Sequence, residues 1–182
     1  EYFLYTLQHD PKFLEGIQPL TLLGRAVGWL YTDGSLEHEK TVKGIGGVCF
    51  PAPPEGAGKQ TPSWFGEYID PSVSGYTHIA PIEMFAIFRA LALFGHLLKG
   101  KAVWLFCDNT HAVGCLLRRS SMIPEETRKR ALESRPHTPE DHFYALPANL
   151  RRGMNELARL IWQKVSELDI LLWVEYVWTK VN

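Results

Sequence analysis

Alternation of apolar and polar residues is clearest in the first part of the chain. From Ala26 onward, every second residue is apolar, which predicts a strand that ends at Asp33-Gly34. A glycine-rich run over residues 44–50 and an alternating run over residues 63–69 predict two further strands. Because short connections favour pairing between consecutive strands, we expect these three to form an antiparallel meander.

The middle of the chain changes to a helical pattern and then back to a strand. Pro81 stands where proline is best tolerated, at the start of a helix, and residues 82–98 are apolar almost all round. Gly100 ends this helix. Residues 101–108 form a nearly continuous apolar run, which is typical of a central strand covered on both faces.

The remaining pattern completes a mixed α/β fold. Asn109 caps a short helix over residues 110–118, an amphipathic helix follows over 148–168, and a last strand over 170–177. The order of elements predicts a mixed five-stranded sheet with helices packed on it. We expect residues 1–25 to be an arm or linker and residues 26–182 to be the domain, with a polar and basic insert over 119–147.

Composition narrows the class of protein. The 182 residues carry 19 basic and 20 acidic side chains, so bulk positive charge does not drive nucleic-acid binding. The three cysteines form no CxxC pair, which argues against a disulfide scaffold and a zinc ribbon. No membrane span and no signal peptide are evident, so we expect an intracellular location, cytoplasmic or nuclear. Since the chain starts at Glu1 and stops at Asn182, we expect it to be a piece of a longer polypeptide, truncated at its C-terminal end.

Three carboxylates occupy positions of chemical interest. Asp33 closes the first predicted strand, Asp108 closes the fourth, and Glu83 lies in the first turn of the apolar helix. The helical stripe that starts at Glu83 continues through apolar residues only, namely Ile87, Ala90, Leu91 and Phe94. A carboxylate on a core-facing stripe costs several kcal/mol unless something compensates.

Each carboxylate also has an ordinary structural explanation. Asp33-Gly34 is a turn signal, Asp108 could cap a helix, and Glu83 could reach water at the helix edge. Their conjunction favours a shared site, because these ends can converge at one edge of a mixed sheet. Three converging carboxylates suit two hard cations, Mg²⁺ or Mn²⁺, which would activate a water and stabilise the leaving oxygen of a phosphodiester.

Three short motifs resemble the acidic motifs of ribonuclease H. They are Tyr31-Thr32-Asp33-Gly34-Ser35, Ile82-Glu83-Met84-Phe85-Ala86 and Phe106-Cys107-Asp108-Asn109-Thr110. The order of elements from about Ala26 to Asn182 is also similar to the ribonuclease H fold. The motifs and the ending WVEYVWTKVN are closest in style to the domains attached to retroelement (retrotransposon) reverse transcriptases.

The resemblance implies an endonuclease that hydrolyses the RNA strand of RNA–DNA hybrids by a two-metal mechanism. Asp33, Glu83 and Asp108 would be catalytic and would hold the metals, and a reverse transcriptase domain would share the polypeptide. The resemblance also places a fourth acidic ligand a few residues beyond Asn182. Neither Asp169 nor Glu175 replaces that ligand by motif.

A basic segment gives a candidate nucleic-acid interface. Residues 116–152 contain eight basic and five acidic side chains. The basic ones include Arg118, Arg119, Arg128, Lys129 and Arg130. Such residues supply phosphate contacts without sequence preference. A solvated helix with charge pairs four residues apart explains the same run equally simply.

Three residues beside the carboxylates join this interface. Gly34 and Ser35 are placed for backbone contact with the substrate, and we expect Asn109 to lie at the same edge.

Two other functions remain open at this point. A non-catalytic ribonuclease H-like scaffold or nucleic-acid-binding module would share the fold without the activity. A phosphotransferase of another α/β fold could use Asp33 as a nucleophile, although the three-strand meander argues against it.

Overall fold

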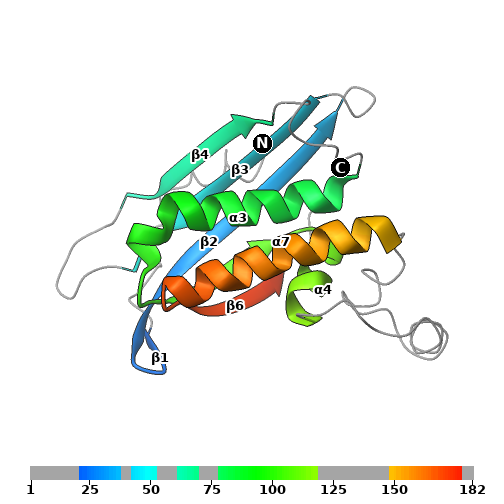
Figure 1. The fold of residues 1–182 in the computed structure, drawn as a ribbon. Helices are drawn as coiled ribbons and strands as arrows, with labels where there is room; N and C mark the ends of the chain where they lie inside the picture. The colour runs from blue at the N-terminus through cyan, green and yellow to red at the C-terminus, as the bar shows by residue number, and fades with distance from the viewer. Residues whose placement is uncertain (1–20, 38–41, 53–60, 70–77, 119–147, 178–182) are drawn as a thin grey trace.

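The strands form one mixed sheet in the order β4-β3-β2-β5-β6 (Figure 1). The computed structural model describes residues 21–37, 42–52, 61–69, 78–118 and 148–177. Strand β2 (Arg25–Glu37) pairs antiparallel with β3 (Val42–Phe50), and β3 pairs antiparallel with β4 (Ser63–Tyr68). The predicted meander of three strands is therefore confirmed.

A short hairpin precedes β2. Strand β1 (Thr21–Leu22) turns through Leu23 and Gly24 and pairs with the first residues of β2. Both turn residues have positive φ, 50° and 75°, as a two-residue hairpin turn requires. The last residues of the expected N-terminal arm thus belong to the sheet, whereas residues 1–20 lie outside the described part.

The prediction that the first strand ends at Asp33-Gly34 is wrong. Strand β2 continues to Glu37, and Asp33 pairs with Gly46 of β3 inside the antiparallel ladder. The glycine that signals a turn lies within the strand because helix α3 packs against Gly34, where a side chain would have no room.

The second half of the sheet is parallel. Strand β5 (Ala102–Cys107) runs parallel to β2 on one side and to β6 (Leu171–Tyr176) on the other. Helix α3 (Ile79–Leu98) precedes β5, and Gly100 ends the connection with a φ of +72°. This central position explains the continuous apolar run of β5.

Helix α3 begins before Pro81, not at it. His78 is the N-cap, and its Nδ1 accepts a hydrogen bond of 3.2 Å from the backbone N–H of Ala80. Pro81 then falls in the first turn, where the backbone N–H groups have no partner within the helix, so its missing N–H costs nothing.

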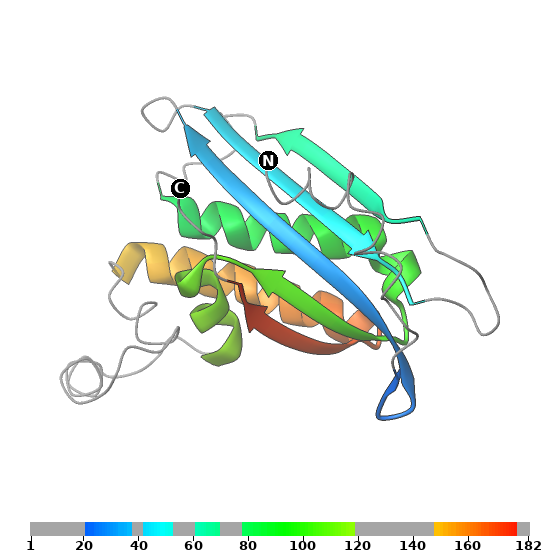
Figure 2. The same cartoon turned by 180° about the vertical axis from the view of Figure 1, so that it is seen from behind.

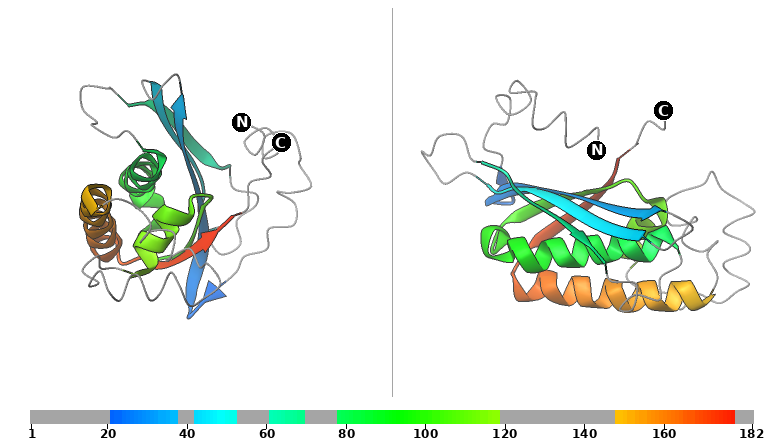
Figure 3. Two further views of the ribbon diagram at one scale, coloured as in Figure 1. Left: turned by 90° about the vertical axis from the view of Figure 1, so that its right-hand side faces the viewer. Right: turned by 90° about the horizontal axis from the view of Figure 1, so that it is seen from above.

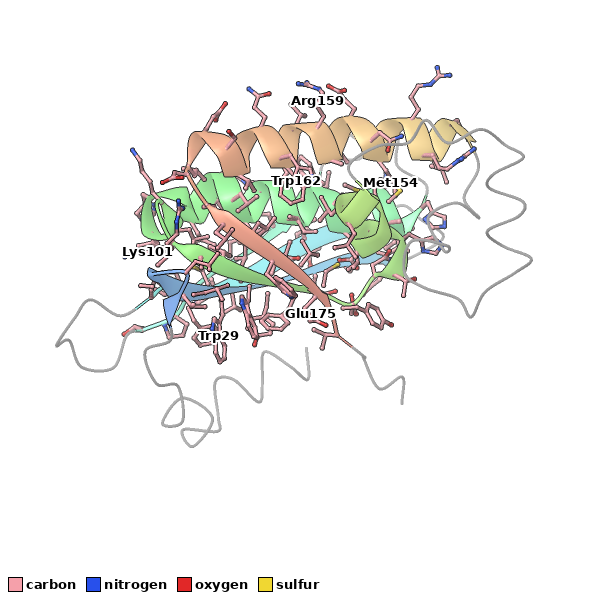
Figure 4. The ribbon with its side chains drawn as sticks, turned by 90° about the horizontal axis from the view of Figure 1, so that it is seen from below. Trp29, Lys101, Met154, Arg159, Trp162 and Glu175 are labelled. Atoms are coloured by element: carbon pink, nitrogen blue, oxygen red, sulfur yellow. The ribbon has the colours of Figure 1, made fainter. Side chains whose placement is uncertain are left out.

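Two long helices cover one face of the sheet. Helix α7 (Ala148–Glu167) lies beside α3, and the shorter α4 (Thr110–Arg118) lies beside the middle part of α7 (Figures 1 and 3). Trp162 of α7 points into this layer and donates a hydrogen bond of 3.2 Å to the carbonyl of Leu116, whereas Arg159 points away (Figure 4). The core between helices and sheet is fully buried and includes Leu30, Met84, Leu91, Leu105 and Ile161.

The opposite face of the sheet carries aromatic side chains. Among the described residues, no helix covers this face (Figure 2). Trp29 lies there, on the far side of the sheet from α7 (Figure 4), and contacts Phe106 edge to face. Tyr31 stacks on Phe106 with ring centroids 4.5 Å apart.

Helix α3 is long and apolar enough to cross a membrane by composition alone. Its mean hydropathy reaches 1.5 in an 18-residue window, and 61% of that window is buried inside the protein. The sequence-based prediction that no membrane span is evident overlooked that this helix meets the length and composition of one. Its packing between the sheet and α7 accounts for its composition, because a central helix is apolar on most sides.

Candidate metal centre

The register of the parallel strands brings Asp33 and Asp108 to the same level of the sheet. Tyr31 on β2 stands opposite Phe106 on β5, and each aspartate follows its strand partner by two residues. Neighbouring strands lie about 4.8 Å apart, so the two carboxylates occupy adjacent positions. The expected convergence of these strand segments at one edge is found, although Asp33 lies inside its strand and not at its end.

Glu83 joins them from α3, next to Gly34. The expectation that Glu83 lies in the first turn is wrong, because the helix begins at Ile79 and Glu83 falls one residue beyond that turn. A Cβ atom at Gly34 would lie 3.1 Å from both the carboxyl carbon and the backbone nitrogen of Glu83. The absence of a side chain at Gly34 therefore lets the helix approach the strand closely. The backbone N–H of Gly34 lies close enough to act on Glu83, and it lowers the pKa of that carboxyl group.

Burial disfavours the charged form of the Glu83 carboxyl group. Its side chain is only 3% exposed, and Oε2 has no hydrogen-bond partner in the described part of the chain. Burial raises the pKa of Glu83 well above its ordinary value, and the nearby charges of Asp108 and then Asp33 raise it further. The alternative that Glu83 simply reaches water at the helix edge does not describe this side chain.

The Asp33 carboxylate also has a raised pKa, although it is more exposed to solvent than Glu83. Its side chain reaches solvent, yet the protein around it removes water from one side and raises its pKa. The charge of Asp108 raises the pKa further, while the Gly34 N–H lowers it. The charges of Asp108 and Asp33 thus both act on Glu83. Glu83 and Asp108 belong to a group of potential metal donors that lie within 4.8 Å of one another, and Asp33 is not part of that group.

The structure adds a residue that the sequence argument did not select. Cys107, directly before Asp108, is buried, and its Sγ and the carboxylate oxygens of Glu83 and Asp108 lie within 4.8 Å of one another. Burial is the largest cause that raises the pKa of the Cys107 thiol well above its ordinary value, followed by the charge of Glu83. The signal was present, since Cys107 lies inside the third motif, but a single cysteine in a strand usually packs as an apolar residue.

The predicted nucleic-acid residues are only partly described. Asn109 caps α4, because its Oδ1 accepts hydrogen bonds of 3.1 Å from the N–H groups of His111 and Ala112. Gly34 lies under Glu83, and the Oγ of Ser35 lies beside Gly44. Arg118 is the last residue of α4, with its side chain outside the described set. The positions Arg119, Arg128, Lys129 and Arg130 lie outside the described residues altogether.

Two further acidic residues have partners elsewhere. Asp169 forms an ion pair of 3.2 Å with Arg25, and Glu175 accepts a hydrogen bond of 3.1 Å from the indole of Trp173.

Comparison with known proteins identifies the fold. No family model and no curated protein matches the sequence. Among solved structures, the chain is similar to RNase H1 from the halophilic archaeon Halobacterium salinarum, with 13% identity, a TM-score of 0.51 and coverage of 83% of this chain and 85% of that one. It is also similar to LC9-RNase H1, a type 1 RNase H with the type 2 active-site motif, with 15% identity, a TM-score of 0.55 and coverage of 85% and 64%. The chain therefore has the α/β fold of ribonuclease H.

The donor set fits hard divalent cations. Asp33, Glu83 and Asp108 offer carboxylate oxygens, which Mg²⁺ and Mn²⁺ prefer. The unpartnered Oε2 of Glu83 is a buried acceptor that a cation would satisfy. Binding of such an ion would also relieve the repulsion that raises the pKa values of Glu83 and Asp33.

Proposed function

We propose that this protein is a metal-dependent endonuclease that hydrolyses the RNA strand of RNA–DNA hybrids. The observation that carries the proposal is the buried, unpartnered carboxylate of Glu83, set beside Asp33 and Asp108 in a ribonuclease H fold. A fold that only needed a stable core would gain by replacing this group with an apolar one.

The three carboxylates have distinct positions for this task. Asp33 reaches solvent on β2, Asp108 follows β5, and Glu83 lies beneath them in the core. Together they would hold two divalent ions, which supply an activated water and stabilise the leaving oxygen of a phosphodiester. Hydrolysis would leave a 3′-hydroxyl and a 5′-phosphate.

Neighbouring backbone groups keep the carboxylates in place. Close packing of Gly34 against Glu83 restrains this side chain from the strand side, and the Asn109 cap fixes the turn that follows Asp108. Both contacts come from rigid elements, which favours a fixed geometry for the ligands.

Substrate choice rests on shape and not on base sequence. The hybrid has an A-form-like helix with 2′-hydroxyls on one strand, and these features distinguish it from DNA. Gly34, Ser35 and Asn109 lie next to the carboxylates, where they would meet the backbone of the cleaved strand. Arg118, Arg119, Arg128, Lys129 and Arg130 would supply phosphate contacts.

The wider context is a retroelement. We infer that the domain belongs to a polypeptide with a reverse transcriptase, because its three acidic motifs and its C-terminal strand resemble those of retroelement domains. In that setting the hybrid substrate is the product of reverse transcription.

A cleavage assay tests the proposal. Hybrid, RNA–RNA and DNA–DNA duplexes of one sequence, each labelled on one strand, are incubated with the protein in Mg²⁺ or Mn²⁺. We expect cleavage of the RNA strand in the hybrid only, loss of cleavage with a chelator, and product ends that a ligase accepts without prior phosphorylation.

A non-catalytic scaffold is the competing function. It would bind the hybrid without cleaving it in either metal, and metal-independent binding with no product would favour it over the nuclease.

A further inference from the structure

The thiol of Cys107 has no role in a centre made for hard cations. It faces the helical layer from β5, is 1% exposed, and stands next to Asp108 in the chain. Its Sγ lies within 4.8 Å of carboxylate oxygens from both Glu83 and Asp108. The centre therefore contains a soft donor as well as hard ones.

This donor set suits another class of metal. Thiolate ligands favour Zn²⁺ and Cd²⁺, whereas Mg²⁺ is bound by oxygen alone. A tetrahedral Zn²⁺ holds its oxygen and sulfur donors at about 2.0–2.3 Å, which places them roughly 3.3–3.7 Å apart. The three donor atoms lie within 4.8 Å of one another, so a small inward shift of the side chains would reach that geometry, and a water would complete four ligands.

The unpartnered oxygen of Glu83 also points to a ligand at this group of donors. The residue is only 3% exposed, and its Oε2 accepts no hydrogen bond from any described residue. A cation bound to Cys107 and Asp108 would lie next to this oxygen, because all three donor atoms lie within the same 4.8 Å.

We propose that Glu83, Cys107 and Asp108 bind one thiophilic divalent cation, Zn²⁺ or Cd²⁺, and that this ion inhibits hydrolysis by occupying ligands that the hard cations need. Binding replaces the S–H bond of Cys107 by a sulfur–metal bond and releases the proton to water, with no change of oxidation state. The inhibition rests on the proposed nuclease function, whereas the binding does not.

The other two cysteines provide matched controls. Cys49 is buried in the aliphatic core, and Cys115 lies near Asn155, with 3.7 Å between its Sγ and the amide oxygen. Among the residues that the structure describes, only Cys107 is grouped with two acidic side chains. A double variant Cys49→Ala/Cys115→Ala keeps the proposed site, and Cys107→Ala removes it.

Titration with Cd²⁺, followed by the ultraviolet sulfur-to-cadmium charge-transfer band, tests the binding. The experiment uses the full 182-residue chain in a phosphine reductant, and circular dichroism verifies the fold of each variant. We expect a saturable band at one Cd²⁺ per chain in the wild type and in the double variant. The band should be absent in Cys107→Ala, and the affinity for Cd²⁺ should fall at least about tenfold in Glu83→Gln.

Two results would overturn the site. A band that persists in Cys107→Ala places the sulfur ligand elsewhere, and an unchanged Cd²⁺ affinity in Glu83→Gln removes the carboxylate from the site. Because this readout needs no catalysis, it stands even if the protein does not cleave hybrids.

Inhibition is measured separately, as the Zn²⁺ concentration that halves hybrid cleavage in constant Mg²⁺. Each variant is normalised to its own activity without Zn²⁺. We expect Cys107→Ala to need at least about ten times more Zn²⁺ than the double variant. Equal sensitivity of the two would contradict inhibition through this site.

Discussion

Two glutamates near helix α3 meet opposite environments. Glu67 on β4 accepts hydrogen bonds of 2.9 and 2.8 Å from the guanidinium of Arg89, six residues along α3 from Glu83, and both side chains are partly exposed. The Arg89 hydrogen bonds lower the pKa of Glu67. Glu83 is buried with one oxygen unpartnered, and burial together with two negative neighbours raises its pKa.

The comparison distinguishes Glu67, a structural carboxylate with a protein partner, from Glu83, a buried carboxylate with an oxygen that could bind a ligand. Glu67 has a protein partner that satisfies it, so its charge is compatible with the folded state as it stands. Glu83 has two acidic neighbours where Glu67 has a cation, and the fold tolerates the resulting strain. A carboxylate in that state gains most from a cation, and the predictions below test this contrast.

The largest effect should be on catalysis. Asp108→Asn removes a ligand charge while keeping the shape of the side chain, and we expect hybrid cleavage in Mg²⁺ to fall at least about 1,000-fold, or ~4 kcal/mol of transition-state stabilisation. Single-turnover cleavage measures it. Glu67→Gln is the matched control, and it should cleave at the wild-type rate. Near wild-type cleavage by Asp108→Asn would remove Asp108 from the site.

Close packing under Glu83 gives the next largest effect. A methyl group at Gly34 would press against the Glu83 carboxyl carbon and backbone nitrogen at 3.1 Å and against Ile82 at 3.2 Å. We expect Gly34→Ala to destabilise the protein by about 1–3 kcal/mol, the usual cost of overpacking, and to impair cleavage.

Gly66 on β4 is the control for this substitution, because a Cβ there meets nothing within 4 Å. Gly66→Ala should change stability by no more than about 0.5 kcal/mol. Denaturant unfolding of both variants measures the difference. Equal stabilities would mean that the close contact between α3 and β2 does not constrain the fold.

Neutralising Glu83 should stabilise the metal-free protein. Because the folded-state pKa of Glu83 is raised, the folded protein takes up this proton more readily than the unfolded chain does. Stability without metal should therefore fall as pH rises from the ordinary glutamate range through the raised folded-state value. We expect Glu83→Gln to reduce this dependence and to raise Tm near neutral pH by about 2–4 °C, the shift that 1 kcal/mol produces in a domain of this size.

Thermal unfolding in a chelator at several pH values measures this change. A lower Tm for Glu83→Gln at every pH would show that the carboxylate is satisfied within the protein, which would contradict the contrast with Glu67.

The smallest effect on stability should come from the ion pair between Glu67 and Arg89. Glu67→Gln breaks an ion pair whose side chains are 37% and 39% exposed, so solvent screens it. We expect a loss of about 0.5 kcal/mol or less, and less still in high salt. Denaturant unfolding at two salt concentrations measures it. A loss as large as that of Gly34→Ala would mean that the pair anchors β4 to α3.

Much of the fold could be predicted from the sequence, because the strongest signals were periodic. The bounds of the helix Thr110–Arg118 and its Asn109 cap follow from capping and periodicity, and both are confirmed. The bounds of β2 and α3 were missed, because tertiary contacts override local signals there. Gly34 looks like a turn residue until α3 is seen to pack on it, and Pro81 looks like a first residue until the His78 cap is seen.

Only part of the candidate site could be predicted from the periodic pattern of the sequence. Burial of Glu83 follows from its apolar stripe, and its proximity to Asp108 and Asp33 follows from the sheet topology. Cys107 was not selected, because a single cysteine in an apolar strand usually packs as a core residue, and only the contact with Glu83 distinguishes it. The roles of Asp33, Glu83 and Asp108 in metal binding, and of the basic residues in substrate binding, remain predictions.

Calorimetric titration with Mn²⁺ tests the central claim most directly, namely that the unpartnered Glu83 carboxylate is a metal ligand. Wild type, Glu83→Gln and the control Glu67→Gln are compared at one pH and salt concentration. We predict that wild type and Glu67→Gln bind Mn²⁺ alike and that Glu83→Gln binds at least about tenfold more weakly. Equal Mn²⁺ affinity in all three proteins would contradict the claim.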